Sequence, residues 1–437
     1  MKKEESTMEK IVSLAKRRGF IYQGSEIYGG LAGTWDYGPL GVALKKNIEN
    51  LWWRMFVESR EDMYGVDSAI LMNPKVWEAS GHVSGFSDPL VECQKCKRRF
   101  RADHLEDKNK CPDCGGKLGG ERQFNMMFKA NIGAAEDGSS IVYMRPETAQ
   151  GMFVNFKNIV DSFHPKLPFG IAQIGKSFRN EIAPRDFIFR VRELEIMEFE
   201  YFVEEKRWNE LFEYWREKTH EWFAALGFEK SDIKEVELPD GERAHYSKRT
   251  MDFYFKYPHK FDEIGGIAYR TDFDLRRHTE TSGVDLRYVD QTTNEKFIPH
   301  VLEPTFGLGR HVLAVLVKAY TEDELGGEKR VVLRFPPHLA PVKVAVFPLL
   351  KNKPELVLKA REVYTILKKE FGAVMFDDNG NIGKRYRRQD EIGTPFCVTV
   401  DFDTLTDDTI TVRDRDTGKQ ERVPISELTS RVNSLIL

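Results

Sequence analysis

Four of the five cysteines occur as two Cys-x2-Cys pairs, a spacing typical of a metal site. Cys93 and Cys96 form the first pair, and Cys111 and Cys114 form the second pair 14 residues later. Two turns that each present two thiolates supply the four soft ligands of a tetrahedral Zn²⁺ ion. Because four cysteines leave no open position on the metal, we expect a structural site. The alternative is a ribbon that has lost its metal and kept its thiols.

Residues 170–177 match the phosphate-binding formula Gly-x4-Gly-Lys-Ser letter by letter. A loop that binds phosphate in this way follows a buried strand and precedes a helix, whose N-terminus meets the phosphates. Here a loop-like segment with two prolines, residues 163–168, comes before the formula. The residues after it lead through Arg179 and Pro184 into a strand pattern. This context disfavours a P-loop, and a P-loop ATPase remains as a rival interpretation.

Two neighbouring segments with strand texture carry charges in a pattern that indicates a ligand. The first runs from Phe169 into Phe178-Arg179-Asn180-Glu181, and the second covers residues 188–203. Side-chain alternation predicts two groups, each on one strand face: Arg179 with Glu181, and Arg190 with Leu194 and Glu198. Charges are costly in a dry core, so this face is either a wet cleft or the site of a charged ligand. The alternative is a sheet face exposed to solvent.

The segment Gly307-Leu308-Gly309-Arg310 precedes an apolar helical pattern that extends to Tyr320. An arginine in the first turn of a buried helix opposes the helix dipole. We therefore expect an anion beside Arg310, since a guanidinium binds phosphate and carboxylate well. An interdomain salt bridge is the alternative.

The elements that must position these residues belong to a chain of 437 residues with 66 basic and 69 acidic side chains and a net charge of −3. Any contact with nucleic acid must therefore come from a local patch. No apolar stretch is long enough to span a membrane, and the N-terminus lacks the apolar region of a signal peptide. Few cysteines, mostly in metal-type pairs, fit a reducing compartment. We expect a cytoplasmic protein.

Shifts in composition divide the chain into domains. Residues 1–335 form the first, interrupted by a basic, cysteine-containing insertion at 92–122 and a mainly helical insertion or extension at 205–250. A segment with three prolines, 335–341, is interpreted as a linker. After it, residues 338–437 alternate strand and helix patterns, which predicts a separate α/β domain.

A compact basic and aromatic cluster lies in this last domain: Lys384, Arg385, Tyr386, Arg387 and Arg388. Such side chains suit phosphates and an unstacked base, so we interpret the cluster as a tRNA contact. Taken alone, such a run is more often a solvated helix face.

Together these segments resemble class II aminoacyl-tRNA synthetases. Residues 178–181 with Arg190, Leu194 and Glu198 are similar to motif 2 of that family, 307–310 to motif 3, and 42–74 to motif 1. Other segments resemble the single-chain homodimeric type of glycyl-tRNA synthetase: Arg145-Pro-Glu-Thr-Ala-Gln-Gly151, Tyr28-Gly-Gly30, Asp36-Tyr-Gly-Pro-Leu-Gly41 and Glu303-Pro304. The resemblance covers nearly the whole chain.

The resemblance implies an α+β fold with an antiparallel sheet flanked by helices, a zinc-ribbon-like insertion and a C-terminal anticodon-binding domain. It also implies ATP-dependent ligation of glycine to tRNA(Gly) through a glycyl-adenylate. Mg²⁺ would accompany ATP, structural Zn²⁺ would occupy the insertion, and the chain would dimerise through motif 1 without contacting a membrane.

Two arginines are implied to be catalytic. Arg179 would hold the α-phosphate during attack, Arg310 would hold the γ-phosphate of a bent ATP, and Glu181 would accept from the adenine amino group. These roles are electrostatic and positional, as phosphoryl chemistry requires. The whole implied ATP set is Arg179, Asn180, Glu181, Phe189, Arg190, Leu194, Glu263, Gly307, Gly309 and Arg310.

The resemblance assigns Glu147, Glu198 and Glu303 to the glycine ammonium, with the Thr305 hydroxyl and Arg60 nearby. Converging carboxylates without a cation raise one another's pKa, so we expect the ammonium of the ligand to complete the charge balance. Glycine has no side chain to bind, so larger amino acids must be rejected by filled volume.

The sequence departs from the family pattern at two site positions. Leu194 replaces a phenylalanine that stacks on adenine, and this duty would pass to Phe189 or another ring. Thr305 replaces a serine, which keeps the hydroxyl and adds a methyl group. A non-catalytic binding protein on the same scaffold is the other rival, but such a protein has no reason to retain these charges.

Overall fold

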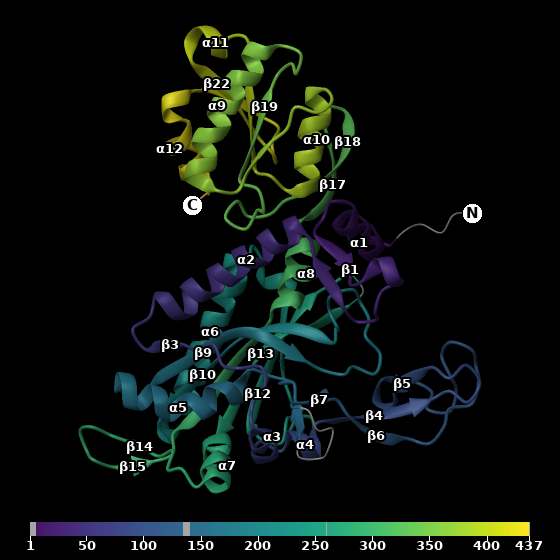
Figure 1. Ribbon diagram of the computed structural model, residues 1–437, viewed down its shortest axis with the longest axis vertical. Coiled ribbons are helices and arrows are strands. Elements are labelled where there is room, and N and C mark those ends of the chain that lie inside the picture. Colours follow the sequence, from purple (N-terminus) through teal and green to yellow (C-terminus); the bar gives the residue numbers. More distant parts are fainter. Residues whose placement is uncertain (1–5, 134–139, 259, 437) are drawn as a thin grey trace.

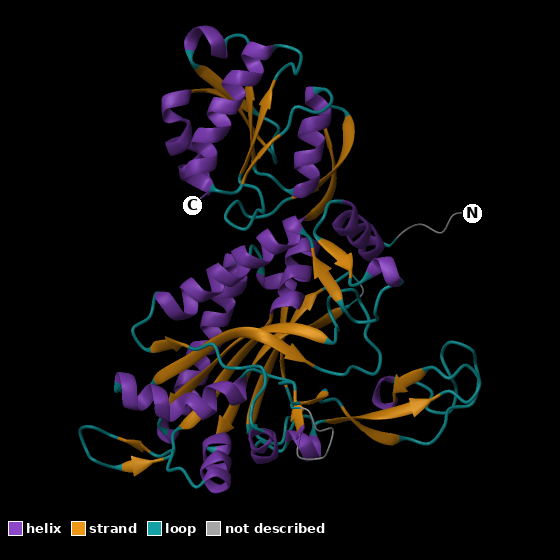
Figure 2. Ribbon diagram, in the orientation of Figure 1, coloured by secondary structure: helices purple, strands orange, loops and turns teal. Residues whose placement is uncertain are grey.

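The computed structural model describes residues 6–133, 140–258 and 260–436, and it comprises a large sheet-based domain and a smaller C-terminal domain (Figures 1 and 2). Residues 1–5 and 437, at the outer ends of the two predicted domains, lie outside the described residues. None of the described helices has the length and apolar character needed to cross a membrane.

A seven-stranded sheet forms the centre of the large domain. All neighbouring strands are antiparallel except β3 and β9, which run parallel. The order across the sheet is β11 (Ile233–Glu237), β12 (Arg249–Lys256), β13 (Phe261–Thr271), β16 (His300–Gly307), β10 (Glu193–Val203), β9 (Phe169–Phe178) and β3 (Met63–Gly65). This arrangement agrees with the expected class II core fold.

One face of the sheet is covered by helices and an aromatic core. Three helices pack on it: α2 (Pro39–Trp53), which continues as a π-helical turn (Arg54–Glu58), α6 (Trp208–Ala225) and α8 (Leu308–Ala319). Trp52 lies 6.1 Å from the Phe199 ring of β10, and Trp215 of α6 lies 4.6 Å from it. Such burial of large rings stabilises the domain and holds the strands in register.

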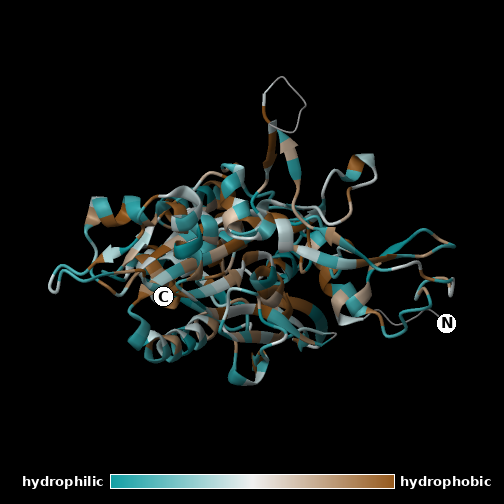
Figure 3. Cartoon of the chain, turned by 90° about the horizontal axis from the view of Figure 1, so that it is seen from below, coloured by the Kyte–Doolittle hydropathy of each residue, from teal (hydrophilic) through white to brown (hydrophobic). Residues whose placement is uncertain are grey.

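The opposite face of the same strands is polar and forms the candidate site. Because side chains alternate, β10 presents Phe199 and Tyr201 to the aromatic core and Glu198 and Glu200 to the other side. Helices α5 (Ala149–Phe163) and α7 (Phe273–Ser282) flank this second face. The surface helices show alternating apolar and polar stretches, as expected for helices with one buried face (Figure 3).

The predicted strand pair around motif 2 exists, but its strands are shorter than expected. β9 ends at Phe178 and β10 begins at Glu193, so residues 179–192 form a loop, which we call the motif 2 loop. Asp186 and Phe187 adopt φ of 60° and 59°, a conformation that interrupts any strand. The prediction that strand alternation aligns Arg179 with Glu181 is therefore wrong, because a loop brings these side chains together.

Residues 170–177, which match the P-loop formula, lie inside β9 and pair along their length with β10. A strand in the middle of a sheet has no free run of amides with which to surround a phosphate. The Lys176 ammonium contacts Glu193 of the neighbouring strand. The P-loop interpretation is excluded.

The cysteine-containing insertion forms its own small sheet of β4 (Ser87–Glu92), β5 (Arg99–Arg101) and β6 (Arg122–Asn125). It projects away from the main sheet in two perpendicular views (Figures 1 and 3). The helices α3 (Pro74–Ala79) and α4 (His82–Gly85) lead into it, and the hairpin strands β7 (Lys129–Asn131) and β8 (Ile141–Tyr143) follow. The insertion is thus slightly wider than the predicted range 92–122.

The segment 205–250 is helical only in its first half. Helix α6 ends at Ala225, and β11 then adds the outermost strand of the main sheet. The prediction of a mainly helical segment is corrected here: residues 233–237 pair with β12 in full antiparallel register, and Ile233 packs on the core.

The C-terminal domain is an α/β domain, as predicted. Its sheet has the order β20 (Val374–Phe376), β19 (Val344–Pro348), β21 (Phe396–Val400), β22 (Thr409–Asp414) and β23 (Gln420–Pro424). The first three strands are parallel, and β22 and β23 continue the sheet in antiparallel pairing. Its helices are α9 (Pro354–Phe371), α10 (Ile382–Ile392), α11 (Thr404–Asp407) and α12 (Ile425–Ile436).

The connection between the domains is packed rather than loose. Phe335, Leu339 and Ala340 of the proline-containing linker are fully buried. The hairpin β17 (Tyr320–Leu325)–β18 (Glu328–Leu333) follows α8 and contacts α10, where buried Arg330 lies 3.0 Å from Asp390. The other described α-helix and strands are α1 (Thr7–Arg17), β1 (Ile21–Gln23), β2 (Trp35–Tyr37), β14 (Tyr288–Val289) and β15 (Lys296–Phe297).

Candidate functional site

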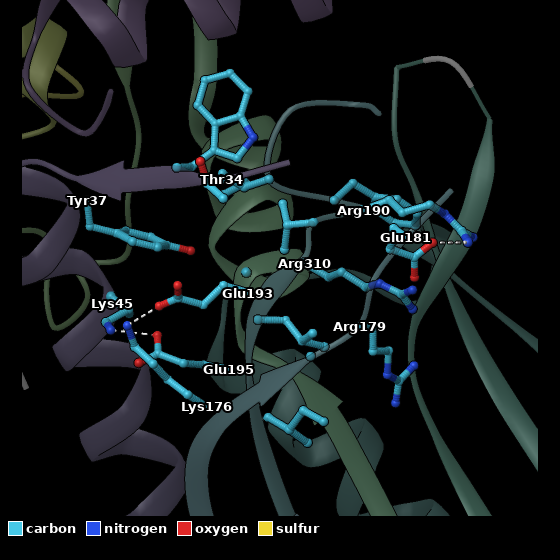
Figure 4. Close-up of a pocket in the computed structure, with 18 of the residues that line it drawn as sticks. Thr34, Tyr37, Lys45, Lys176, Arg179, Glu181, Arg190, Glu193, Glu195 and Arg310 are labelled. Carbon is cyan, nitrogen blue, oxygen red and sulfur yellow. Dashed lines mark hydrogen bonds and ion pairs between the residues drawn. The ribbon is translucent and has the colours of Figure 1, made fainter. Parts of the chain in front are cut away.

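A cavity of about 470 Å³ lies where β10 begins and β16 ends, beside the motif 2 loop. All predicted ATP-binding residues except Asn180 line it, and Thr305 lines it as well. The backbone N–H of Asn180 donates to the Met126 carbonyl. Figure 4 shows two charged groups: Arg179, Glu181, Arg190 and Arg310 at one end, and Lys45, Lys176, Glu193 and Glu195 at the other.

Arg179 directly follows β9, and its side chain is fixed by contacts at Nε and on one face of the guanidinium. Its Nε donates to the Pro146 carbonyl at 3.0 Å, and its guanidinium lies 5.5 Å from the Phe86 ring centroid. Among the described residues its two terminal nitrogens have no hydrogen-bond partner. The terminal N–H groups are therefore free to bind an anion in the cavity.

Arg310 enters the cavity from the first turn of α8. It lies 2.8 Å from the Glu263 carboxylate, and its guanidinium lies 4.7 Å from the Phe189 ring centroid. Phe189 is thus a platform under Arg310, while Leu194 lies on the cavity wall. Across the same end, Arg190 Nη1 lies 3.5 Å from Glu181 Oε2. The cavity therefore carries more than one cation where a polyanion would lie.

The three predicted glycine-site carboxylates lie together on the polar face of the sheet. Glu198 accepts hydrogen bonds from the hydroxyls of Thr305 and Thr148, each at 2.5 Å. Burial raises the pKa of Glu198, and the charge of Glu147 adds to this rise. Carboxylate oxygens of Glu198 and Glu303 lie within 4.8 Å of each other. Thr305 links this acidic cluster to the cavity.

Sequence reasoning missed the buried cation in this cluster. Arg270 of β13 is 0% exposed and forms a bidentate pair with Asp274, with both distances at 2.8 Å. Its third donor reaches Glu303 at 2.5 Å, and the Tyr246 ring lies 3.7 Å from the guanidinium. An Arg-x3-Asp pattern at the end of a strand is the only sequence signal for it. The free cluster therefore already holds one compensating charge.

Glu147 is supported by two side chains that the sequence did not single out. His82 Nε2 lies 3.2 Å from one carboxylate oxygen, and Gln150 Nε2 donates to the other at 3.0 Å. Burial alone would raise the pKa of Glu147, but His82, Arg270 and Gln150 together hold it far below its usual value. Glu147 is therefore an ionised, fixed acceptor.

The assignment of Arg60 to the glycine site is wrong. Its guanidinium forms a bidentate pair with Asp62 and lies 4.7 Å from the Trp215 ring centroid. Trp215 packs against Phe199, which points to the aromatic face of β10. Arg60 is thus separated from Glu198 by the sheet itself, because alternate residues of a strand point to opposite faces.

The four predicted metal ligands converge at the tip of the insertion. The Cys93 and Cys114 sulfurs lie 3.6 Å apart, and those of Cys96 and Cys111 lie 3.7 Å apart. A tetrahedral Zn²⁺ with Zn–S bonds of about 2.3 Å needs sulfurs about 3.8 Å apart, so the residues fit this ion.

Purified protein is expected to contain about one zinc ion per chain, because the four thiolates form a closed tetrahedral set. Metal analysis of wild type and Cys111→Ser would show this, with the variant depleted in zinc. Limited proteolysis should then cut the variant within 92–122, since the small apolar core of the insertion is built around the four cysteines. A zinc-free wild type whose insertion resists protease would contradict the assignment.

The predicted basic cluster is only partly at the surface. Arg385 is 1% exposed, and its guanidinium donates to the backbone carbonyls of Pro348, Asp378 and Gly380. The Tyr386 hydroxyl bonds Thr399. Arg385 is therefore a structural residue and is withdrawn from the tRNA set, since α10 turns it inward.

The other three members of the cluster remain on the outer side of α10. Lys384 is exposed, while Arg387 and Arg388 are half-buried and pair with Glu328 and Asp377. They form a smaller basic surface than the sequence indicated.

Comparisons with known proteins agree with this geometry. Residues 128–319 match the family described as "tRNA synthetase class II core domain (G, H, P, S and T)", and residues 343–435 match "Anticodon binding domain". A protein of Treponema denticola named glycine–tRNA ligase is 50% identical over 100% of this chain and 98% of its own length. One from Clostridium acetobutylicum is 50% identical over 98% of both chains, and one from Caldanaerobacter subterraneus is 51% identical over 97% of both. The chain belongs to the glycine–tRNA ligase family of class II tRNA synthetases.

Proposed function

We propose that this chain ligates glycine to tRNA(Gly) in two steps. The glycine carboxylate attacks the α-phosphorus of ATP, forming glycyl-adenylate and releasing pyrophosphate. A hydroxyl of the tRNA 3′-terminal ribose then attacks the carbonyl carbon, and AMP leaves. The observation that carries this proposal is Thr305, which lines the arginine cavity and donates to Glu198 of the acidic cluster. A polyphosphate site and an ammonium site therefore adjoin.

The two arginines would act by electrostatics. Arg179, with free terminal nitrogens, would bind the α-phosphate oxygens as negative charge builds up during attack. Arg310, held over Phe189 by Glu263, would bind the γ-phosphate, and Glu181 would receive the adenine amino group. Mg²⁺ would enter with ATP, since this ion is held largely by substrate phosphates. The Glu263 carboxylate, which lies beside Arg310, would be a protein ligand of this Mg²⁺.

The glycine ammonium would lie among Glu147, Glu198 and Glu303. Ionised Glu147 and doubly hydrogen-bonded Glu198 are fixed in orientation before the ligand arrives. Such preorganised acceptors favour a small cation over water. The Thr305 methyl group would occupy part of the space beside the glycine α-carbon, which would exclude alanine by contact.

The hydroxyl of Thr305 is expected to matter more than its methyl group. In Thr305→Val, Glu198 loses a donor inside a buried site, which costs about 1–3 kcal/mol and raises the glycine KM roughly 5- to 150-fold. Thr305→Ser keeps the donor and serves as the matched control, with a KM within about threefold of wild type. Glycine titration of pyrophosphate exchange measures both. Equal KM values for the two variants would contradict the role.

The C-terminal domain would bind the tRNA through the exposed part of α10. Lys384→Ala is expected to raise the tRNA KM and to reduce the salt slope of binding by about one unit, with glycine activation unchanged. Arg385→Ala should instead destabilise the domain by about 1–3 kcal/mol, because three backbone carbonyls lose their donor and that of Pro348 is buried. Filter binding at several salt concentrations and thermal unfolding separate the two. If Arg385→Ala were as stable as wild type but bound tRNA more weakly, Arg385 would be a tRNA contact and not a structural residue.

We further propose that the enzyme works as a cytoplasmic homodimer with structural zinc. Free thiols in a closed four-cysteine set favour a reducing compartment. Val42 on α2 and Leu71 on the segment after β3 are exposed apolar side chains of the motif 1 region and suit an interface between two copies. Analytical ultracentrifugation of the purified chain measures its oligomeric state, and a monomer at micromolar concentration would refute the dimer.

The amino acid specificity tests the proposal directly. Exchange of labelled pyrophosphate into ATP is measured with each of the twenty amino acids in turn. Glycine alone should support exchange, and tRNA(Gly) should then become charged. A binding protein without catalysis gives no exchange with any amino acid, and exchange supported by another amino acid overturns the substrate assignment.

A further inference from the structure

Glu200 is a buried carboxyl in the middle of the acidic cluster that has no hydrogen-bond partner in the described part of the chain. It follows Glu198 by two residues on β10, so both side chains point to the same face of the sheet. Its exposed fraction is 0%, and among the described residues neither carboxylate oxygen has a hydrogen-bond donor. An ionised carboxylate in such a place costs several kcal/mol, in order of magnitude. The side chain therefore needs either a proton or a cation.

The strand register places Glu200 directly opposite Glu303. Glu198 pairs with Thr305 and Tyr201 pairs with Leu302 across β10 and β16, and this register aligns the two glutamates between them. Carboxylate oxygens of Glu198, Glu200 and Glu303 all lie within 4.8 Å of one another. Like charges directly across a strand pair repel, so one of the two opposed groups is expected to stay neutral.

The charged surroundings contain too few cations to ionise every carboxyl. Arg270 of β13 is already committed to Asp274 of α7 and Glu303 of β16. The second cation near the cluster, Arg145, acts on Glu198 from a distance, and its guanidinium donates to the carbonyls of Lys176 and Ser68. The other titratable groups around the cluster are Glu198 on β10, Glu147 before α5, His82 on α4, Tyr246 beside Arg270, and His278, which bonds Gln150. On the β9 side, Glu200 faces the apolar residue Ile171. Burial and the charge of Glu303 raise the pKa of Glu200 well above its usual value.

We propose that Glu200 and Glu303 share one proton in the free enzyme, and that the ammonium of bound glycine displaces it to solvent. Glu200 is then a positioning residue: the shared proton removes one negative charge from the Glu200–Glu303 pair and so reduces the repulsion among Glu198, Glu200 and Glu303 before the substrate binds. When the ammonium enters, its positive charge replaces that of the proton, and both carboxylates become acceptors. This inference rests on the proposed function, because it takes glycine as the ligand.

Calorimetric titration with glycine in buffers of different ionisation enthalpy tests the proposal. The slope of observed enthalpy against buffer enthalpy counts the protons released per glycine bound. At pH 7 the wild type is expected to release about 0.5 to 1 proton per glycine. The upper limit is one, because the two carboxyl groups share a single proton. A wild type that releases none overturns the proposal without any variant.

The variant Glu200→Gln identifies the source of the proton. Its amide mimics the neutral acid, so the variant is expected to bind glycine within about threefold of wild type and to release almost no proton. The matched control is Glu237→Gln, an exposed position on β11 of the same sheet, which should release protons like wild type. Unchanged release from a folded Glu200→Gln overturns the proposal, because the proton then comes from another group.

Two further comparisons are informative, one with added metal ions and one with the exchange assay. Unchanged glycine titration after addition of excess sodium, potassium or magnesium chloride excludes a metal ion as the neutralising cation, whereas competition by one of them overturns proton sharing. If glycine neither binds nor supports pyrophosphate exchange, the proposed function fails together with this inference. If glycine is activated but its binding releases no proton, only this inference fails.

Discussion

Replacing Arg179 with alanine is expected to lower the kcat for glycine-dependent pyrophosphate exchange by about 10²- to 10³-fold, the usual loss for one electrostatic donor at a reacting centre. The physical reason is the free end of its guanidinium. The Pro146 carbonyl and the Phe86 ring hold the shaft and one side of Arg179, while its terminal nitrogens have no hydrogen-bond partner among the described residues. In the proposed mechanism these nitrogens bind the negative charge that develops in the transition state.

Because the interaction strengthens in the transition state, kcat and kcat/KM for ATP should fall together. Arg179→Lys retains the charge but not the fork geometry, and we expect it to recover only part of the rate. Lys176→Ala is the matched control, since that ammonium is paired with Glu193 on a strand. Its rate should change by less than about threefold. The reverse ranking, with Lys176 essential and Arg179 dispensable, would contradict the assignment of the nucleotide site.

The elements of the fold were predictable wherever a short-range pattern specifies them. The alternating strands around residues 169–203 and the helix after Gly307 follow from local periodicity. The start of β10 could not be predicted from local periodicity. The motif 2 loop turns at Asp186 and Phe187, which adopt positive φ although neither is a glycine that would have indicated a turn. The edge strand β11 was missed for a similar reason, since only its pairing with β12 makes it a strand.

The site residues also divide into those that a sequence pattern indicates and those that only the tertiary structure places. Glu198 and Glu303 came from a family resemblance. The pairing of Glu303 with Arg270 and the approach of Glu198 to Glu303 depend on the register of β13, β16 and β10, which no local pattern reveals. Arg60 was misplaced because a charge near a strand end carries no sign of the sheet face it joins. The error at Arg385 was avoidable: with Gln389 and Ile392 it forms the buried i, i+4, i+7 row of α10.

Removal of Arg270 is expected to be the most destabilising single change in the proposed glycine site. Its guanidinium is fully buried and pairs with Asp274 and Glu303, so Arg270→Ala leaves two buried carboxylates without their cation. Breaking a buried pair in this way costs about 3–5 kcal/mol. Glycine activation should be lost as well, because Glu303 no longer has a fixed orientation. Thermal unfolding and pyrophosphate exchange measure the two effects.

The pH dependence of the lost stability identifies its cause. Burial already raises the pKa of Glu303 above its unfolded value, and Arg270 is the neighbour that opposes this rise. Without Arg270 the folded-state pKa rises further, so Glu303 binds its proton more tightly in the folded than in the unfolded chain. The destabilisation should therefore grow as the pH rises from about 5 to 8 and shrink at acid pH. Arg276→Ala on the exposed side of α7 is the control, and its effect should stay below about 1 kcal/mol at every pH. An Arg270→Ala protein that melts like wild type across this range would show that Arg270 does not neutralise the cluster, and would leave the bound ammonium as its principal cation.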